Sequence, residues 1–266
     1  MKTSMRIGMV ALAATFIASS AAAIQGVITM ANSQQQREGD IKWSVRDKAY
    51  AITIKGQPIE LMMKPEEISD LQIPRPAELD TALNAMQQGN AAAAIPMLEK
   101  IANDYLMLKW DGPATRYLAE ALVQAGKADE AIRVCEKVIA ANPEAAYLGE
   151  MAPAYWQALL KRDRVSKVDE LLAKAIKTGD RTASAHALVM RGDLILAGGD
   201  TAENAKKALR DGYLRVITLY TSERSAQPEA LYKAAKSFEK MGQTGRADKY
   251  RTQLKGEYGA SEWARK

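Results

Sequence analysis

The apolar positions between Gly126 and Pro143 follow the period of an α-helix. They fall at residues 131, 134, 135, 138 and 139, which is the i, i+3, i+4, i+7, i+8 spacing of a single helix face. Gly126 precedes this face and adopts the positive φ of a turn at little cost. Pro143 ends it, because proline cannot continue a helix. The pattern predicts a turn followed by one amphipathic helix.

The same outline recurs along the chain at a fixed spacing. In three units a glycine lies five residues before an alanine and seven residues after another one: Ala82-Gly89-Ala94, Ala119-Gly126-Ala131 and Ala235-Gly242-Ala247. Two looser units lie between the second and third of these. One spans residues 151–178 with Asp163 at the glycine position. The other spans residues 183–221 with Gly192 and Gly199 in register and about five extra residues before its second helix. Such self-similarity predicts about five stacked helix hairpins.

Small side chains at these positions have a physical role. Two antiparallel helices approach closely where they cross, so Ala119 and Ala131 are expected to face each other inside one hairpin, whereas Ala128 is expected in an exposed turn. Trp156 occupies the small-residue position of the third unit, opposite Val168. Two interpretations remain open there: the hairpin is splayed or shifted, or the third repeat is misaligned.

The pattern resembles the tetratricopeptide repeat, with Ala119, Leu122, Gly126, Ala131 and Pro143 at matching positions. The resemblance covers about residues 76–266. It departs from the family in lacking the tryptophan at the start of each first helix and in the 37-residue distance from Gly89 to Gly126, against the usual 34. The closing segment 228–266, with its "EYGASEWARK", is similar to the end of the repeat domain of the Tol-Pal-associated cell-division coordinator, although the coiled-coil segment of that family is missing.

The stretch before the repeats has the period of β-strands. "QGVITMA", "GDIKWSV" and "KAYAITI" alternate apolar and polar residues, Lys55-Gly56-Gln57 is a tight turn, and "PIELMM" pairs back. "KPEEISD" predicts one helical turn before a last strand at residues 71–73. Five short strands with this turn resemble a small SH3-like barrel, in which closure of the sheet supplies the surface that the apolar faces need. The fold class is therefore mainly α: a TPR-like α-solenoid of about five hairpins preceded by a small all-β domain.

The first residues have the layout of a secretory signal peptide. Lys2 and Arg6 are followed by an apolar run at 7–18 and by Ala21-Ala22-Ala23, an Ala-x-Ala cleavage site. We therefore expect export to the periplasm or the exterior. The predicted organisation is a signal peptide at 1–23, a β domain at 24–73, a linker at 74–76 and the repeat domain at 77–266. No later segment is long and apolar enough to predict a transmembrane helix.

Composition and motifs limit the functions that the sequence supports. The formal charge of +5 falls when Lys2 and Arg6 are removed, and both signs alternate along the chain, so no basic stripe for nucleic acid is predicted. Cys135 is the single cysteine and lies on the apolar face, which predicts a buried thiol. His186 is the single histidine and is expected on a helix surface. Nucleophile-elbow, phosphate-loop and zinc motifs are absent from the sequence, so no catalytic residue, metal or cofactor is predicted.

These observations favour a non-catalytic scaffold for protein–protein interaction. The resemblance implies a concave groove for a peptide or protein partner, lined by the first helix of each hairpin. Its implied lining consists of mixed polar residues and one aromatic: Arg116, Glu120, Gln124, Gln157, Lys161, Asp193, Tyr232 and Lys236. Two alternatives remain. One is a permanent structural subunit of an envelope or secretion complex, which a large exposed apolar patch would favour. The other is a cell-wall-acting enzyme with scattered site residues.

Overall fold

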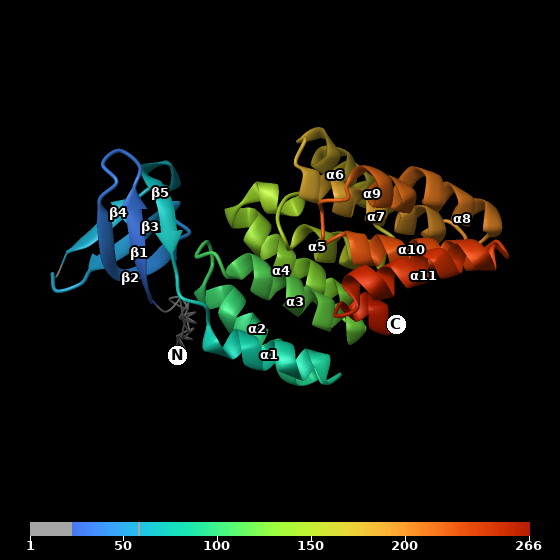
Figure 1. Cartoon of the computed structure of the whole chain (residues 1–266). Helices are drawn as coiled ribbons and strands as arrows, with labels where there is room; N and C mark the ends of the chain where they lie inside the picture. The colour runs from blue at the N-terminus through green and yellow to red at the C-terminus, as the bar shows by residue number, and fades with distance from the viewer. Residues whose placement is uncertain (1–22, 58) are drawn as a thin grey trace, which may run out of the picture.

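A computed structural model describes residues 23–57 and 59–266 (Figure 1). It places a small β-sheet at one end of a longer array of helices. Residues 1–22 of the expected signal peptide lie outside the described part. None of the helices in the described ranges has the length and apolar character needed to span a bilayer.

The N-terminal sheet contains five strands and a helical turn in the predicted order, although its last strand begins at Ile68, three residues earlier than predicted. Its elements are β1 (Ile24–Met30), β2 (Gln36–Ser44), β3 (Ala49–Ile54), β4 (Glu60–Met63), a 3-10 turn (Pro65–Glu67) and β5 (Ile68–Gln72). The pairing is antiparallel throughout, in the order β4-β3-β2-β1-β5. Gly56, with φ of +76°, forms the expected turn between β3 and β4.

The SH3-like barrel is wrong in one respect: within the described residues the sheet is open. β4 pairs only with β3 and β5 only with β1. The apolar side of the open sheet instead adjoins the helical region at the segment of residues 105–110. Ile28, Ile41 and Ile52 belong to one apolar cluster that continues into the helical region. Two hydrogen bonds join the parts, from Tyr50 Oη to the Met107 carbonyl and from Trp110 Nε1 to the Ile73 carbonyl, both 3.1 Å.

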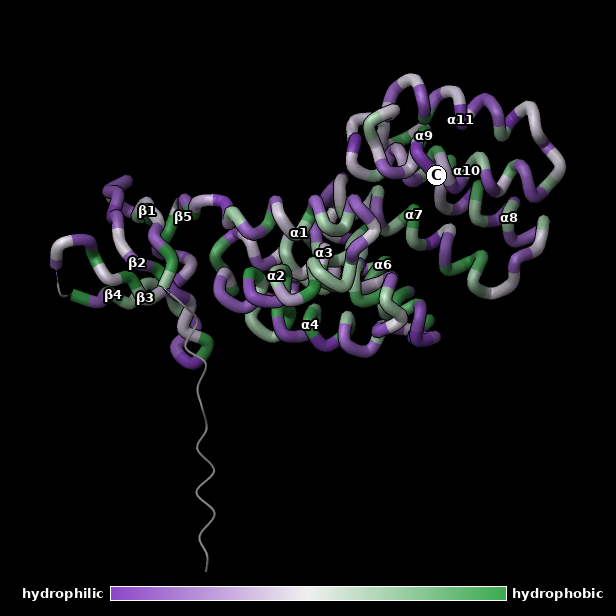
Figure 2. Tube along the Cα trace, turned by 90° about the horizontal axis from the view of Figure 1, so that it is seen from below, coloured by the Kyte–Doolittle hydropathy of each residue, from purple (hydrophilic) through white to green (hydrophobic). Residues whose placement is uncertain are grey.

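The helices form five antiparallel hairpins, as the repeats predict. They are α1 (Ala77–Gln87) with α2 (Ala91–Asp104), α3 (Asp111–Gln124) with α4 (Ala128–Ala141), α5 (Ala152–Leu160) with α6 (Val165–Lys177), α7 (Arg181–Ala197) with α8 (Ala202–Ala208) and its continuation α9 (Leu214–Leu219), and α10 (Gln227–Lys240) with α11 (Thr244–Tyr258). A π-helical segment, Leu209–Tyr213, joins α8 to α9. Short 3-10 turns lie at Pro143–Ala146 and Glu262–Arg265. Along the tube of Figure 2, hydrophobic and hydrophilic residues interleave within the helices, as amphipathic packing requires.

The turns confirm the repeat register, including that of the third unit. Gly89, Gly126 and Gly242 have φ values of +78°, +76° and +71°. Asp163, at the glycine position of the third hairpin, also has positive φ, at +53°. A non-glycine residue adopts this region at a cost, and Asp tolerates it better than most. The third repeat is therefore correctly aligned.

Because the third repeat is correctly aligned, Trp156 lies at the position that holds alanine or glycine in the other repeats, and this hairpin accommodates the larger side chain there. The indole is fully buried and donates from Nε1 to the Ala146 carbonyl at 2.8 Å. In the fourth hairpin the extra residues do not precede the second helix, which begins at Ala202. They lengthen that helix, which contains the π-helical segment.

The second hairpin has the close packing expected of it. Ala119 and Ala131 are fully buried, and Cys135 lies on the same face with no exposed surface. Burial raises the pKa of the Cys135 thiol to about 12, so the group is neutral at physiological pH. Ala128 differs from the expectation. It is the first residue of α4 and is 9% exposed, so it is not in an open turn.

We expect Ala131→Leu to destabilise the protein by about 1–3 kcal/mol, because three extra carbons must enter a filled interior. Ala140→Leu is the matched control, since Ala140 is an exposed residue of the same helix. Leucine suits a helix nearly as well as alanine, so the control should change stability by less than about 0.5 kcal/mol. Urea denaturation of both variants measures the difference. Equal stabilities would show that Ala131 is not at a helix crossing.

Candidate functional site

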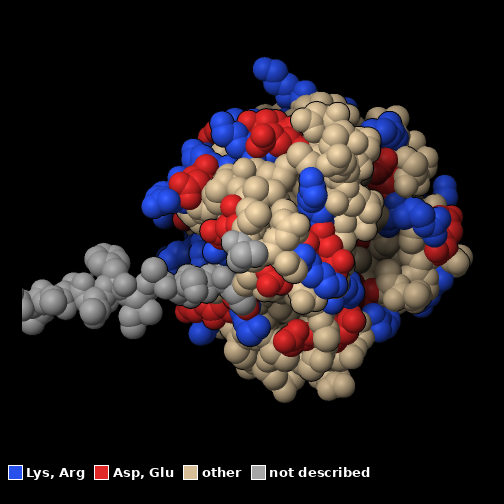
Figure 3. All heavy atoms as spheres, turned by 90° about the vertical axis from the view of Figure 1, so that its left-hand side faces the viewer, with Lys and Arg blue, Asp and Glu red and all other residues tan. Residues whose placement is uncertain are grey.

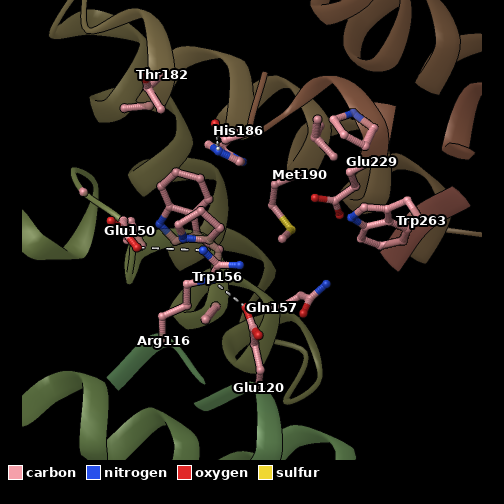
Figure 4. Close-up of a pocket in the computed structure, with 18 of the residues that line it drawn as sticks. Arg116, Glu120, Glu150, Trp156, Gln157, Thr182, His186, Met190, Glu229 and Trp263 are labelled. Carbon is pink, nitrogen blue, oxygen red and sulfur yellow. Dashed lines mark hydrogen bonds and ion pairs between the residues drawn. The ribbon is translucent and has the colours of Figure 1, made fainter. Parts of the chain in front are cut away.

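The first helices of the last four hairpins surround a cavity of about 650 Å³ (Figure 4). Its walls come from α3, α5, α7 and the start of α10, with the segment before α5 and the last 3-10 turn closing two sides. This is the inner side of the solenoid on which the repeat pattern predicts a groove.

Two of the walls show why the sequence builds this surface. On α3 the lining residues are 116, 120, 123 and 124, and on α7 they include 182, 186, 189 and 190. Both sets have the i, i+4, i+7, i+8 spacing of one helix face. Successive first helices therefore present corresponding faces to the same space.

Four of the eight predicted groove residues line this cavity: Arg116, Glu120, Gln124 and Gln157. The other four are placed elsewhere. Lys161 is exposed at the end of α5, and Lys236 is an exposed partner of Glu239 at 3.4 Å. The Tyr232 ring lies against Trp263 at a centroid distance of 5.4 Å. Asp193 accepts hydrogen bonds from Tyr213 Oη at 2.8 Å and from Lys233 Nζ at 2.5 Å, so its carboxylate is engaged within the fold.

The difference has a geometric reason. The cavity meets α3 as far as its last residue, Gln124, but its lining ends at Gln157 on α5, at Met190 on α7 and at Glu229 on α10, before those helices end. The predicted groove residues lie ten, six or two residues before the turn residue of their hairpin, and such a fixed spacing does not follow this shift along the solenoid. Residues 193, 232 and 236 therefore lie three to seven residues beyond Met190 and Glu229, where the lining of their helices ends.

Several lining residues are not identified by the sequence pattern. The pattern marks Trp156 only as an anomaly at a small-residue position, and His186 only as a helix-surface residue. Glu150 precedes α5, and Trp263 lies in the last 3-10 turn, so neither belongs to a first helix. The one available signal is the concentration of aromatic residues, since two of the four tryptophans of the chain line this cavity.

An ion pair lies across one wall. Arg116 Nε is 2.9 Å from Glu120 Oε1, and Arg116 Nη1 is 3.9 Å from Glu150 Oε2. Burial raises the pKa of Glu120; Arg116 opposes that shift, and the nearby Glu262 and Glu229 add to it. Two further carboxylates, Glu229 and Glu262, thus act on Glu120 alongside its partner Arg116.

His186 faces the same space from α7. Its Nε2 lies 3.1 Å from Ser225 Oγ, and burial lowers its pKa, so the imidazole is neutral near pH 7. A nucleophilic serine also requires a group that orients the histidine. Within the described residues no carboxylate hydrogen-bonds to the His186 ring. Nor does any cluster of three or more His, Cys, Asp or Glu side chains in this part of the chain suit a metal ion.

Comparison with known proteins supports the repeat assignment. Residues 85–152 and residues 229–261 match two family models described as tetratricopeptide repeat. The helical region is thus a TPR-like α-solenoid, and the resemblance to this repeat is confirmed. Neither match is specific to the Tol-Pal-associated coordinator, so that finer resemblance stays a prediction. No curated protein matches the chain.

Solved structures show distant likenesses only. A crystal structure of the nearly identical TPR-like repeats of a putative kinesin light chain from Podosopora anserina is 16% identical with a TM-score of 0.41, over 70% of this chain and 95% of that one. A crystal structure of MamA protein is 18% identical with a TM-score of 0.37, over 70% of this chain and 93% of that one. At these TM-scores the likenesses carry no functional information.

Proposed function

We propose that the protein is a non-catalytic interaction scaffold that binds an extended peptide segment of a protein partner in the groove formed by α3, α5, α7 and α10. The observation that carries this is the cavity of about 650 Å³ whose lining combines aromatic rings with charged and polar side chains. Concave sites of this size with a few placed polar groups are typical of ligand binding. TPR-type helix pairs present such concave surfaces to their partners.

The alternative of a permanent structural subunit receives less support. It would require a large apolar interface. Among the described residues, the exposed large apolar side chains are Val165 and Leu219 in the helices and Val45, Ile59 and Met62 in the N-terminal region. On the face shown in Figure 3, Lys and Arg are interspersed with Asp and Glu, with no large area of one sign. These surfaces favour a scaffold that binds through its groove.

Peptide selection on the intact chain tests the groove. We expect a random-sequence display library to yield peptides that the wild type binds and Gln157→Tyr does not, because the ring fills space at the cavity wall. Gln253→Tyr is the matched control, a partly buried glutamine of α11 outside the cavity, and it should leave binding unchanged. If neither variant affects any selected peptide, the groove is not the binding site.

We also propose that the protein is exported and cleaved after Ala23, so that it acts in the cell envelope. The support is the charged start, the apolar run and the Ala-x-Ala site in the sequence. Intact-mass measurement on protein from the native envelope is the test. A mass that retains residues 1–23 would reject cleavage, and absence from the envelope fraction would reject export.

A further inference from the structure

We infer that the groove selects basic segments, and that a Lys or Arg side chain of the partner peptide lies over Trp263 among the carboxylates Glu120, Glu229 and Glu262. This rests on the proposed binding of an extended peptide in the groove. It adds the chemistry of the partner, which the repeat fold does not specify.

The charges that line the groove are unbalanced. Five acidic residues line it, Glu120, Glu150, Asp180, Glu229 and Glu262, against three basic ones, Arg116, Arg224 and Lys266. Three of the carboxylates are paired, Glu120 and Glu150 with Arg116, and Glu229 with Lys233, which lies outside the lining and also pairs with Asp193. Counting Lys233 and Asp193 with the lining gives six acidic and four basic residues, so the excess of two negative charges remains. An incoming cation therefore meets excess negative charge.

The chain itself places a lysine in the proposed position. Lys266 Nζ lies 3.6 Å from the centroid of the Trp263 ring, and both residues line the cavity. The Tyr232 ring lies beside Trp263 at a centroid distance of 5.4 Å, and Lys233 Nζ lies 5.5 Å from the centroid of the same indole. An ammonium or guanidinium over an indole face is the favourable cation–π arrangement. Lys266 is exposed, so a partner's basic side chain can take its place.

The carboxylates near the Trp263 ring differ in whether they form ion pairs within the fold. Glu229 is 2.5 Å from Lys233, which also pairs with Asp193 and is held inside the fold. Glu262 is exposed and forms no ion pair with the described residues. Figure 4 shows Glu229 beside Trp263 at the side of the cavity opposite Glu150. The free carboxylate beside the aromatic platform is the feature that makes this end specific for a cation.

Selection followed by affinity measurement tests the inference. We expect peptides enriched on the wild-type chain to contain Lys or Arg, and replacement of that residue by Gln to weaken binding about tenfold in fluorescence anisotropy, as one desolvated charge pair over an aromatic face allows. Glu262→Gln should weaken the same peptide several-fold, and Lys266→Ala should tighten it. Glu257→Gln, on the exposed face of α11, changes the net charge equally and should have no effect.

The outcomes separate this inference from the proposed function. Neutral or acidic peptides that lose binding in Gln157→Tyr would overturn the basic preference and leave the groove as the binding site. Basic peptides that bind Glu262→Gln and Glu257→Gln equally well would also overturn it. Peptides insensitive to Gln157→Tyr would instead reject groove binding itself. Circular dichroism of each variant excludes a folding defect as the cause of lost binding.

Discussion

Lys233→Met is expected to destabilise the protein by about 3–5 kcal/mol, because it removes the cation from between two poorly exposed carboxylates. Lys233 Nζ lies 2.5 Å from Asp193 Oδ2 and 2.5 Å from Glu229 Oε1. The three side chains are only 15–17% exposed. Methionine retains most of the volume of the aliphatic part of Lys233. The loss of stability therefore measures the effect of the unpaired carboxylates and not that of a cavity.

The stability lost in Lys233→Met should depend on pH in a defined direction. In the wild type, burial raises the pKa of Asp193 even though Lys233 opposes the shift. Without Lys233 that pKa rises further. A carboxyl whose pKa is higher in the folded than in the unfolded state makes the folded state less stable as pH rises through that interval. The deficit should therefore be largest near neutral pH and smaller below the raised pKa of Asp193, where the carboxyl is protonated when folded.

Lys236→Met provides the control for this prediction. Lys236 is three residues further along α10, and its pair with Glu239 is exposed on both sides. Exposed pairs contribute little, so we expect a change within about 0.5 kcal/mol and little dependence on pH. Urea denaturation of both variants at neutral and mildly acidic pH makes the comparison. A Lys233→Met deficit that is small, or that grows on acidification, would contradict the assignment of Lys233 as the neutralising cation.

The same network explains why Asp193 does not line the cavity. Asp193 satisfies the spacing of groove residues, because spacing alone identifies the inner face of a helix. Whether an inner residue meets open space or another helix depends on how neighbouring hairpins rotate. Tyr213 and Lys233 donate hydrogen bonds to the Asp193 carboxylate, and they lie 20 and 40 residues from it in the sequence. Local pattern does not contain such distant pairings.

The strands and the repeat turns were predictable for the opposite reason. Alternation in "KAYAITI" and the glycine, or in the third hairpin Asp163, before each second helix are local features, and the structure places β3 and the positive-φ turns there. Closure of the sheet is not local. The strand pattern requires only that the apolar face be covered. In the structure the sheet remains open, and its apolar cluster continues into the helical region beside the segment that joins α2 to α3.

One contact between α7 and the π-helical segment brings two backbones together. A Cβ at Gly212 would lie 2.7 Å from the Leu188 carbonyl oxygen and 2.9 Å from the Gly192 nitrogen. Both are backbone atoms of α7, which cannot move aside as a flexible side chain can. A Cβ at Gly192 would in turn lie 2.4 Å from the Tyr213 ring. The repeat spacing includes Gly192, but Gly212 lies outside it.

Gly212→Ala is therefore expected to lower stability by about 1–3 kcal/mol, because the two elements must separate. The direction is informative, since alanine favours a helix over glycine by about 1 kcal/mol and would otherwise stabilise it. Gly256→Ala tests that expectation within α11, where a Cβ meets nothing within 4 Å, so it should raise stability by up to about 1 kcal/mol. Opposite signs in urea denaturation would establish the close crossing. A gain from both substitutions would mean that α7 and the π-helical segment are further apart, and the packing that holds Tyr213 against Asp193 would have to be different.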